Sequence, residues 1–147
     1  MFDTAPDQTL NLLIDFKTNG TLLHAAVVAA LEPLRQRGWL STYSFATKTT
    51  TWGPITAIGT GNTPLELVKA QEPRDLFFDA PLGNLASIDY GPEVAPIASG
   101  SYIKAVGYLG GMRGAEPVKQ VLSVQVEEAH ARGIKVRSEE RRVGKEC

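Results

Sequence analysis

Two oppositely charged side chains end an otherwise apolar segment near the start of the chain. The stretch LLIDFKTNG, residues 12–20, carries Asp15 and, two positions later, Lys17. Side chains two residues apart on a strand share a face, so Asp15 and Lys17 are expected to face one space and Phe16 the other. A carboxylate and an ammonium group in one pocket suit a site that binds a divalent cation together with an anionic oxygen.

A third charged residue, Asp79, ends another short apolar segment in the same way. In parallel α/β proteins the carboxyl ends of the strands face the functional cleft, which makes Asp79 a further candidate for the pocket. The alternative is that Asp15 and Lys17 only pair with each other or with a neighbouring strand. Buried charges are kept chiefly when they are paired or functional, so the residues alone leave both interpretations open.

The elements that must position these residues alternate between strand and helix. Strands are predicted at residues 10–17, 54–62, 76–79 and 134–137, with a short possible strand at 94–98 in a long loop over 83–117. Helices are predicted at 21–38, 63–71 and 117–133, and an irregular or hairpin-like excursion at 41–52. The first strand reads as buried on both faces. This alternation predicts an α/β fold with a parallel sheet, either an open sheet or part of a (β/α)8 barrel. A full barrel takes about 250 residues, so a barrel here would be incomplete.

Two helix boundaries carry specific signals. Pro33 lies inside the first helix and predicts a kink or a fresh start near Glu32. Thr63, Pro64 and Glu66 have the spacing of an N-cap, a first-turn proline and a capping box.

Composition excludes several classes of function. The net charge is -1 with acids and bases mixed along the chain, so no basic stripe predicts a nucleic-acid partner. No apolar run approaches the ~20 residues of a transmembrane helix, and no signal-peptide pattern is present. The single cysteine, Cys147, excludes a disulfide framework within one chain.

Other residues that could do chemistry have simpler explanations. The motif GTGN at residues 59–62 is too short for a dinucleotide-binding fingerprint, and a tight turn explains its glycines better. His24 and His130 fall inside helices, where packing or charge compensation at the helix end accounts for them. Ser99, Ser101 and Tyr102 lie in the long loop, where they could touch a ligand or simply be polar loop residues.

The sequence also resembles a known family. TLNLLIDFKTNG, VVAALEPLRQRGWL, PITAIGTGNTPLE, RDLFFDAPLGNL, VAPIASGSY and EEAHARGIKVR, in this order, are similar to the C-terminal half of the fungal altered-inheritance-of-mitochondria proteins. These belong to the PLC-like phosphodiesterase TIM-barrel superfamily, with the glycerophosphodiester phosphodiesterases and sphingomyelinase D-like enzymes. The resemblance covers about residues 9–137.

The resemblance implies phosphodiester cleavage at the mouth of a barrel, assisted by Mg²⁺ or Ca²⁺. Asp15 would be a metal ligand, Lys17 would hold the substrate phosphate, and Asp79 would be a weaker candidate for the pocket. The family's two histidines and its Glu-x-Asp metal pair are expected on strands that precede this stretch. Residues 1–137 are thus expected to form about strands 4 to 7 of the barrel, inactive alone because proton transfer needs a positioned acid.

The tail SEERRVGKEC, residues 138–147, departs from the family. We interpret it as a non-native or disordered segment, with a genuine charged tail as the alternative. An unclosed barrel leaves unpaired strand edges, which predicts a marginal or aggregating product.

Two functions of different classes therefore remain. The first is a fragment of a metal-dependent phosphoric diester hydrolase acting on phospholipid-type or small-molecule diesters. The second is a non-catalytic α/β module that binds a small anion or a protein. The sequence indicates neither the cellular location nor the oligomeric state.

Overall fold

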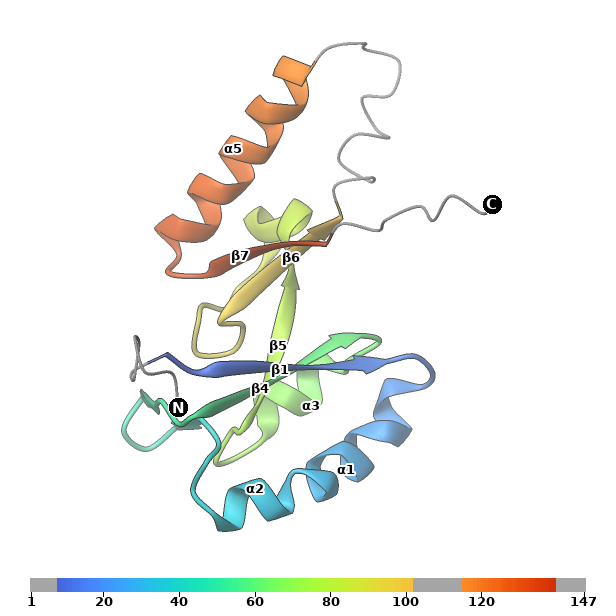
Figure 1. Ribbon diagram of the computed structural model, residues 1–147, viewed down its shortest axis with the longest axis vertical. Coiled ribbons are helices and arrows are strands. Elements are labelled where there is room, and N and C mark those ends of the chain that lie inside the picture. Colours follow the sequence, from blue (N-terminus) through green and yellow to red (C-terminus); the bar gives the residue numbers. More distant parts are fainter. Residues whose placement is uncertain (1–7, 102–114, 140–147) are drawn as a thin grey trace. The chain divides into compact units, whose positions relative to one another are not determined.

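The computed structural model describes residues 8–101 and 115–139, which belong to two compact units divided after Asp79 (Figure 1). The first unit contains β1 (Leu10–Phe16), α1 (Gly20–Ala30), α2 (Glu32–Gln36), β2 (Thr42–Ser44), β3 (Thr49–Thr51), β4 (Ile55–Gly61), α3 (Leu65–Ala70) and most of β5 (Leu76–Pro81). The second contains the 3-10 helix η1 (Leu82–Ser87), β6 (Ile97–Ser101), α5 (Ala115–Ala131) and β7 (Lys135–Glu139). This alternation confirms the predicted α/β class.

The long strands pair in parallel. In the first unit β4 lies between β1 and β5, and in the second β6 pairs with β7. β2 and β3 form a separate antiparallel hairpin, the second of the two interpretations of segment 41–52. The strand predicted at 94–98 begins three residues later, as β6, and η1 was not predicted. β7 extends to Glu139, two residues into the predicted tail, while 140–147 and the residues after Ser101 up to 114 lie outside the described part.

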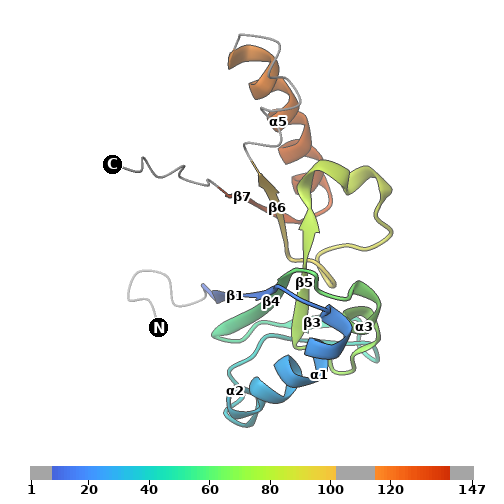
Figure 2. The same ribbon diagram turned by 90° about the vertical axis from the view of Figure 1, so that its right-hand side faces the viewer.

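The core of the first unit lies between its sheet and the two helices α1 and α2. Phe16, Ala57 and Leu76 come from three neighbouring strands and are almost completely buried. Leu23, Val27 and Leu34 pack against this cluster from the helices, and Figure 2 shows α1 and α2 on one side of β1 and β4. Alternation along β1 therefore directs Asp15 to the opposite face, as predicted.

The first helical segment breaks where the sequence predicted. α1 ends at Ala30 and α2 begins at Glu32, with Pro33 in its first turn, where a missing N–H costs nothing. The Asn19 side chain caps α1 by accepting a hydrogen bond from the Leu22 amide at 3.3 Å. The chain turns away from α2 at Gly38, whose φ of 64° favours glycine.

The predicted capping box at α3 is wrong. The N-cap residue is Pro64 rather than Thr63, and no side chain caps the helix. The Thr63 hydroxyl instead donates to the Thr60 carbonyl at 2.7 Å, so it stabilises the turn after β4. Glu66 pairs with Lys69 on the exposed surface of the helix. A competing hydrogen bond within the turn has thus taken the place of the expected cap.

The prediction that the first strand is buried on both faces is also wrong. β1 is an edge strand among those described, paired only with β4. Leu10 and Leu12 keep 46% and 36% of their surface exposed. An edge strand lacks the second neighbour that would cover such side chains.

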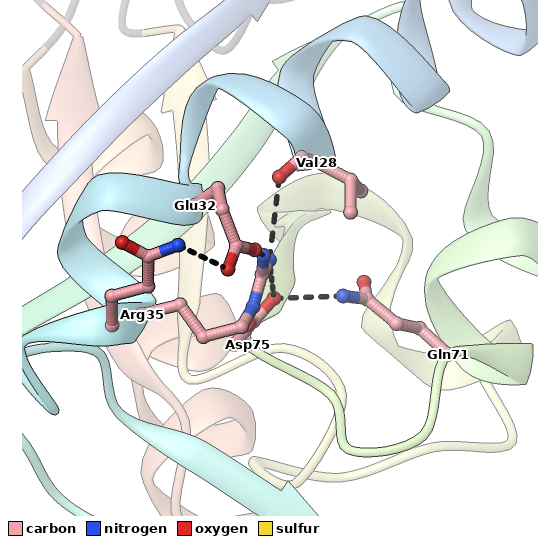
Figure 3. A network of polar contacts seen from close by, with 6 residues as sticks. Val28, Glu32, Arg35, Gln71 and Asp75 are labelled. Carbon is pink, nitrogen blue, oxygen red and sulfur yellow. Dashed lines mark hydrogen bonds and ion pairs between the residues drawn. The ribbon is translucent and has the colours of Figure 1, made fainter.

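A buried ion pair joins α2 to the start of β5 (Figure 3). The carboxylate of Asp75 is completely buried and accepts from Arg35 at 2.5 Å (Nε) and 3.2 Å (Nη2), and from Gln71 at 2.7 Å. Arg35 also contacts the Glu32 carboxylate and donates to the Val28 carbonyl. Hydrogen bonding to Asp75 raises the pKa of the Arg35 guanidinium above its usual value. The network anchors α1 and α2 to the amino end of β5.

The second unit packs α5 against η1 and β7. Ala129 and Ile134, at the end of α5 and before β7, are buried, as is Leu85 of η1. The Arg132 side chain donates to the Ile88 carbonyl at 3.3 Å. Gly133 ends the helix segment with a φ of 73°, which confirms the stop predicted there. No helix in the described parts of the chain is long and apolar enough to cross a membrane.

Candidate functional site

The structure brings Asp15 and Lys17 together as an ion pair just where β1 ends. The side chains keep 45% and 80% of their surface exposed. An exposed pair of this kind contributes about 1 kcal/mol or less to stability. The two residues thus pair with each other, and both charges stay accessible to a ligand.

The last residue of β4, Gly61, and the turn that follows it lie directly beside this pair. Gly61 has a φ of 65°, and a Cβ built on it would lie 2.5 Å from Oδ1 of Asp15 and 2.9 Å from the Phe16 carbonyl oxygen. The backbone N–H of Asn62 donates to the Phe16 carbonyl at 2.9 Å, and the side-chain amide of Asn62 donates to the Thr18 carbonyl at 3.2 Å. The two loops that follow β1 and β4 are thus fixed to each other, and the site has a defined wall.

These contacts explain the glycine motif that the sequence analysis assigned to a tight turn. A Cβ on Gly59 would lie 2.6 Å from the Thr63 side chain and 3.2 Å from the Phe16 ring. Gly59 therefore allows the Thr63 side chain to pack, and Gly61 allows Asp15 to approach. The close approach of Asp15 to Gly61 was missed from the sequence, although the GTGN motif itself was the signal for it.

Asp79 lies on the same face and at the same level of the sheet as Asp15. The register pairs Asp15 with Thr60, and Gly59 with Phe78, so continuing it by one residue sets Thr60 beside Asp79. With neighbouring strands about 4.8 Å apart, the backbones of Asp15 and Asp79 are separated by roughly 10 Å. Asp79 is half-buried and its Oδ1 is shielded from solvent. The three predicted site residues thus share one end of the sheet.

Asp15, Thr60 and Asp79 form a polar row across β1, β4 and β5, and a row of apolar side chains precedes it on the same strands. Leu13 pairs with Ile58, and Ile58 pairs with Phe77. These residues come two positions before Asp15, Thr60 and Asp79 on the same strands, so they lie on the same face of the sheet. Ile58 and Phe77 are completely buried. The charged side chains therefore stand at the solvent end of a layer of buried apolar side chains.

The residue of this site that suits a divalent cation is Asp15. Within 8–101 and 115–139, no three His, Cys, Asp or Glu side chains cluster as metal ligands. Asp15 has the oxygen chemistry that Mg²⁺ or Ca²⁺ prefers, and Mg²⁺ is usually held by one or two carboxylates together with waters and substrate oxygens.

The two histidines lie away from the strand ends, as expected. His24 is half-buried in α1, and burial lowers the pKa of its imidazole below the usual value. His130 is exposed in the last turn of α5. Ser99 of β6 accepts a hydrogen bond from Arg137 at 3.4 Å. Ser101 ends β6, and Tyr102 lies outside the described residues.

Comparison with known proteins identifies the family. Residues 1–79, the extent of the first compact unit, match a sequence profile described as AIM6-like phosphodiesterase domain. The chain is 40% identical over 107 residues to "Altered inheritance of mitochondria protein 6 homolog" of Arthroderma benhamiae, covering 73% of the chain and 33% of that protein. It is 32% identical over 152 residues to "Altered inheritance of mitochondria protein 6" of Eremothecium gossypii, covering 93% of the chain and 39% of that protein.

A further relative comes from Lachancea thermotolerans, with 29% identity over 161 residues, covering 93% of the chain and 37% of that protein. The chain thus spans 33% to 39% of the length of these curated relatives. No solved structure matches it.

The fold and site define a parallel α/β protein with a charged row, Asp15 and Asp79, at the carboxyl ends of its strands. The chain belongs to the AIM6-like phosphodiesterase domain family, which confirms the resemblance found in the sequence.

Proposed function

We propose that this chain is part of a metal-dependent phosphoric diester hydrolase built on a (β/α)8 barrel, whose substrates are phospholipid-type or other small diesters. The match of residues 1–79 to a phosphodiesterase domain carries the proposal, because the same residues hold the paired Asp15 and Lys17. The parallel strands and the charged row at their carboxyl ends support it.

Each charged residue has a distinct role in this proposal. Lys17 attracts a non-bridging phosphate oxygen, for which an ammonium group on a flexible, exposed side chain is suited. Asp15 supplies one oxygen ligand to Mg²⁺ or Ca²⁺, an ion that would polarise the phosphoryl oxygen when bound. Asp79 orients polar groups of the substrate from two strands away. The described strand ends carry no histidine that could act as general acid, so turnover by this chain alone is not expected.

Calorimetric titration tests the metal role. Mg²⁺ and Ca²⁺ are titrated into the wild-type chain, Asp15→Asn and the control Glu66→Gln, which removes an exposed carboxylate on α3. We expect Asp15→Asn to weaken cation binding by roughly tenfold, since a carboxylate is replaced by a neutral amide. Equal affinities for wild type and Asp15→Asn would remove Asp15 from the set of ligands.

The phosphate role is tested with glycerophosphocholine as the probe. We expect Lys17→Gln to weaken its binding in the presence of Mg²⁺, whereas Lys48→Gln, an exposed lysine on the hairpin turn, leaves it unchanged. Metal-dependent hydrolysis of the probe by the purified chain would contradict the expectation that the chain alone is inactive.

A further inference from the structure

The connection between α2 and β4 is unusually long. It covers residues 37–54, whereas connections from helix to strand in α/β units usually take about two to six residues. The segment is ordered as the β2–β3 hairpin rather than as an open loop. Long ordered connections of this kind are where binding functions are usually found.

The hairpin is held rigidly by the chain that precedes β5. Tyr43 and Arg74 exchange backbone hydrogen bonds of 2.8 and 2.9 Å. The buried Arg74 guanidinium lies 5.1 Å from the Tyr43 ring centre and 5.3 Å from that of Phe45. Glu72 accepts a hydrogen bond from the Phe45 amide at 3.0 Å. The hairpin therefore has its shape before any ligand arrives.

This hairpin segment carries the large exposed aromatic side chains of the described residues. Trp39, Phe45 and Trp52 keep 38%, 41% and 55% of their surface exposed. Trp39 and Trp52 come from adjacent backbone, because a Cβ on Gly53 would lie 2.7 Å from the Trp39 carbonyl oxygen. The Arg37 guanidinium lies 4.8 Å from the Trp39 ring centre. Trp39, Trp52 and Arg37 thus come from one end of the hairpin, and Phe45 follows β2 at its other end.

The charge of the segment has one sign. Residues 37–52 contain Arg37 and Lys48 and no acidic residue, while the neighbouring Glu72, whose carboxylate accepts from the Phe45 amide, carries one negative charge. Indole rings prefer the boundary between water and lipid, and each basic residue near an anionic lipid surface gains roughly 1 kcal/mol. Aromatic residues and arginine are also enriched in protein interfaces, whereas lysine is depleted there, so Lys48 is the residue that favours lipid.

The size of the hairpin also favours a lipid surface over a protein. Its strands have three residues each, whereas a standard protein interface needs about 800 Å² from each partner. Peripheral membrane binding needs only a few inserted side chains and some basic charge.

We propose that the hairpin at residues 37–54 docks on an anionic lipid surface, with Trp39, Phe45 and Trp52 in the interface and Arg37 and Lys48 against the headgroups. The hairpin joins β4 at its amino end, where the Ile55 amide donates to the Trp39 carbonyl at 2.9 Å. The candidate site lies at the other end of β4, roughly 20 Å away. This docking surface is therefore separate from the proposed phosphodiester site and does not depend on it.

Tryptophan fluorescence tests the proposal directly, because both tryptophans of the chain lie in this hairpin. The chain is mixed with phosphatidylcholine vesicles with and without phosphatidylserine. We expect a blue shift of the emission and quenching by brominated lipid on the phosphatidylserine vesicles only, weakened by salt. No change in emission on those vesicles would overturn the proposal.

Variants identify the surface through vesicle co-sedimentation. We expect Trp52→Ala to weaken binding by roughly tenfold or more, and Lys48→Gln by about fivefold. Leu22→Ala is the matched control, since Leu22 is 77% exposed on α1. Wild-type binding by Trp52→Ala, or an equal loss in Leu22→Ala, would show that another surface binds. Neither outcome would affect the calorimetric titrations of the phosphodiester site.

Discussion

At the scale of residues, two acids of the first unit have opposite environments. Asp15 is half-exposed beside Lys17 at the carboxyl end of β1, while Asp75 is completely buried beside Arg35 at the amino end of β5. The exposed pair adds little to stability and leaves its charges to a ligand. The buried pair links elements, and loss of one partner would leave the other charge uncompensated.

The two acids that contact Arg35 provide a matched test of this difference. We expect Asp75→Asn to lower the free energy of unfolding by about 2–4 kcal/mol, because its buried charge-assisted hydrogen bonds are weakened. Glu32→Gln, at the exposed end of the same guanidinium, should cost less than about 1 kcal/mol. Urea unfolding followed by circular dichroism measures both. Equal losses would contradict the structural role of Asp75.

At the scale of elements, the turn after β4 both shapes the site and joins two βα loops. Gly61 has a positive φ and lies against Asp15, whereas Gly38, after α2, has nearly the same φ and open space around the position of a Cβ. The two glycines therefore separate the cost of backbone conformation from that of contact with the site.

Alanine substitutions measure these two costs. We expect Gly38→Ala to destabilise the chain by about 1 kcal/mol, the cost of a left-handed backbone. Gly61→Ala should cost about 1–2 kcal/mol more, because its Cβ displaces Asp15 and the Phe16 carbonyl. Urea midpoints of the two variants provide the comparison. If both lost the same stability, the close approach of Asp15 to Gly61 would be of no energetic consequence.

At the scale of the whole molecule, apolar surface remains at one edge of the described sheet. β1 has no second neighbour among the described strands, and α1 carries no charged residue. The charged residue of β1, Asp15, lies near its carboxyl end, and an exposed apolar strand edge promotes association between chains. The sequence-based expectation of a marginal or aggregating product agrees with this edge, and it stays a prediction.

Two lysine substitutions test the edge. Leu12 on β1 and Leu67 on α3 are 36% and 37% exposed, so they differ in position rather than in exposure. We expect the wild-type chain to self-associate, Leu12→Lys to reduce this by blocking edge pairing, and Leu67→Lys to leave it unchanged. Size-exclusion chromatography with light scattering provides the masses. A monodisperse wild-type monomer with a cooperative thermal transition would contradict the prediction.

Local patterns predicted the elements well where one signal dominated. The proline at position 33 and the glycines at 38 and 133 marked helix boundaries that the structure confirms. The capping-box pattern at Thr63 failed because its hydroxyl bonds within the preceding turn. The first strand was misjudged because apolar composition does not reveal how many neighbours a strand has.

The sequence by itself determined the α/β class, the family, and the side of β1 on which Asp15 and Lys17 lie, because these depend on local alternation and on motifs. Only the tertiary structure decided that Asp79 shares their level of the sheet, that Gly61 closes against Asp15, and that Arg35 meets Asp75. Such contacts depend on strand register and on packing between residues far apart in the chain, and no local pattern specifies which distant residues meet.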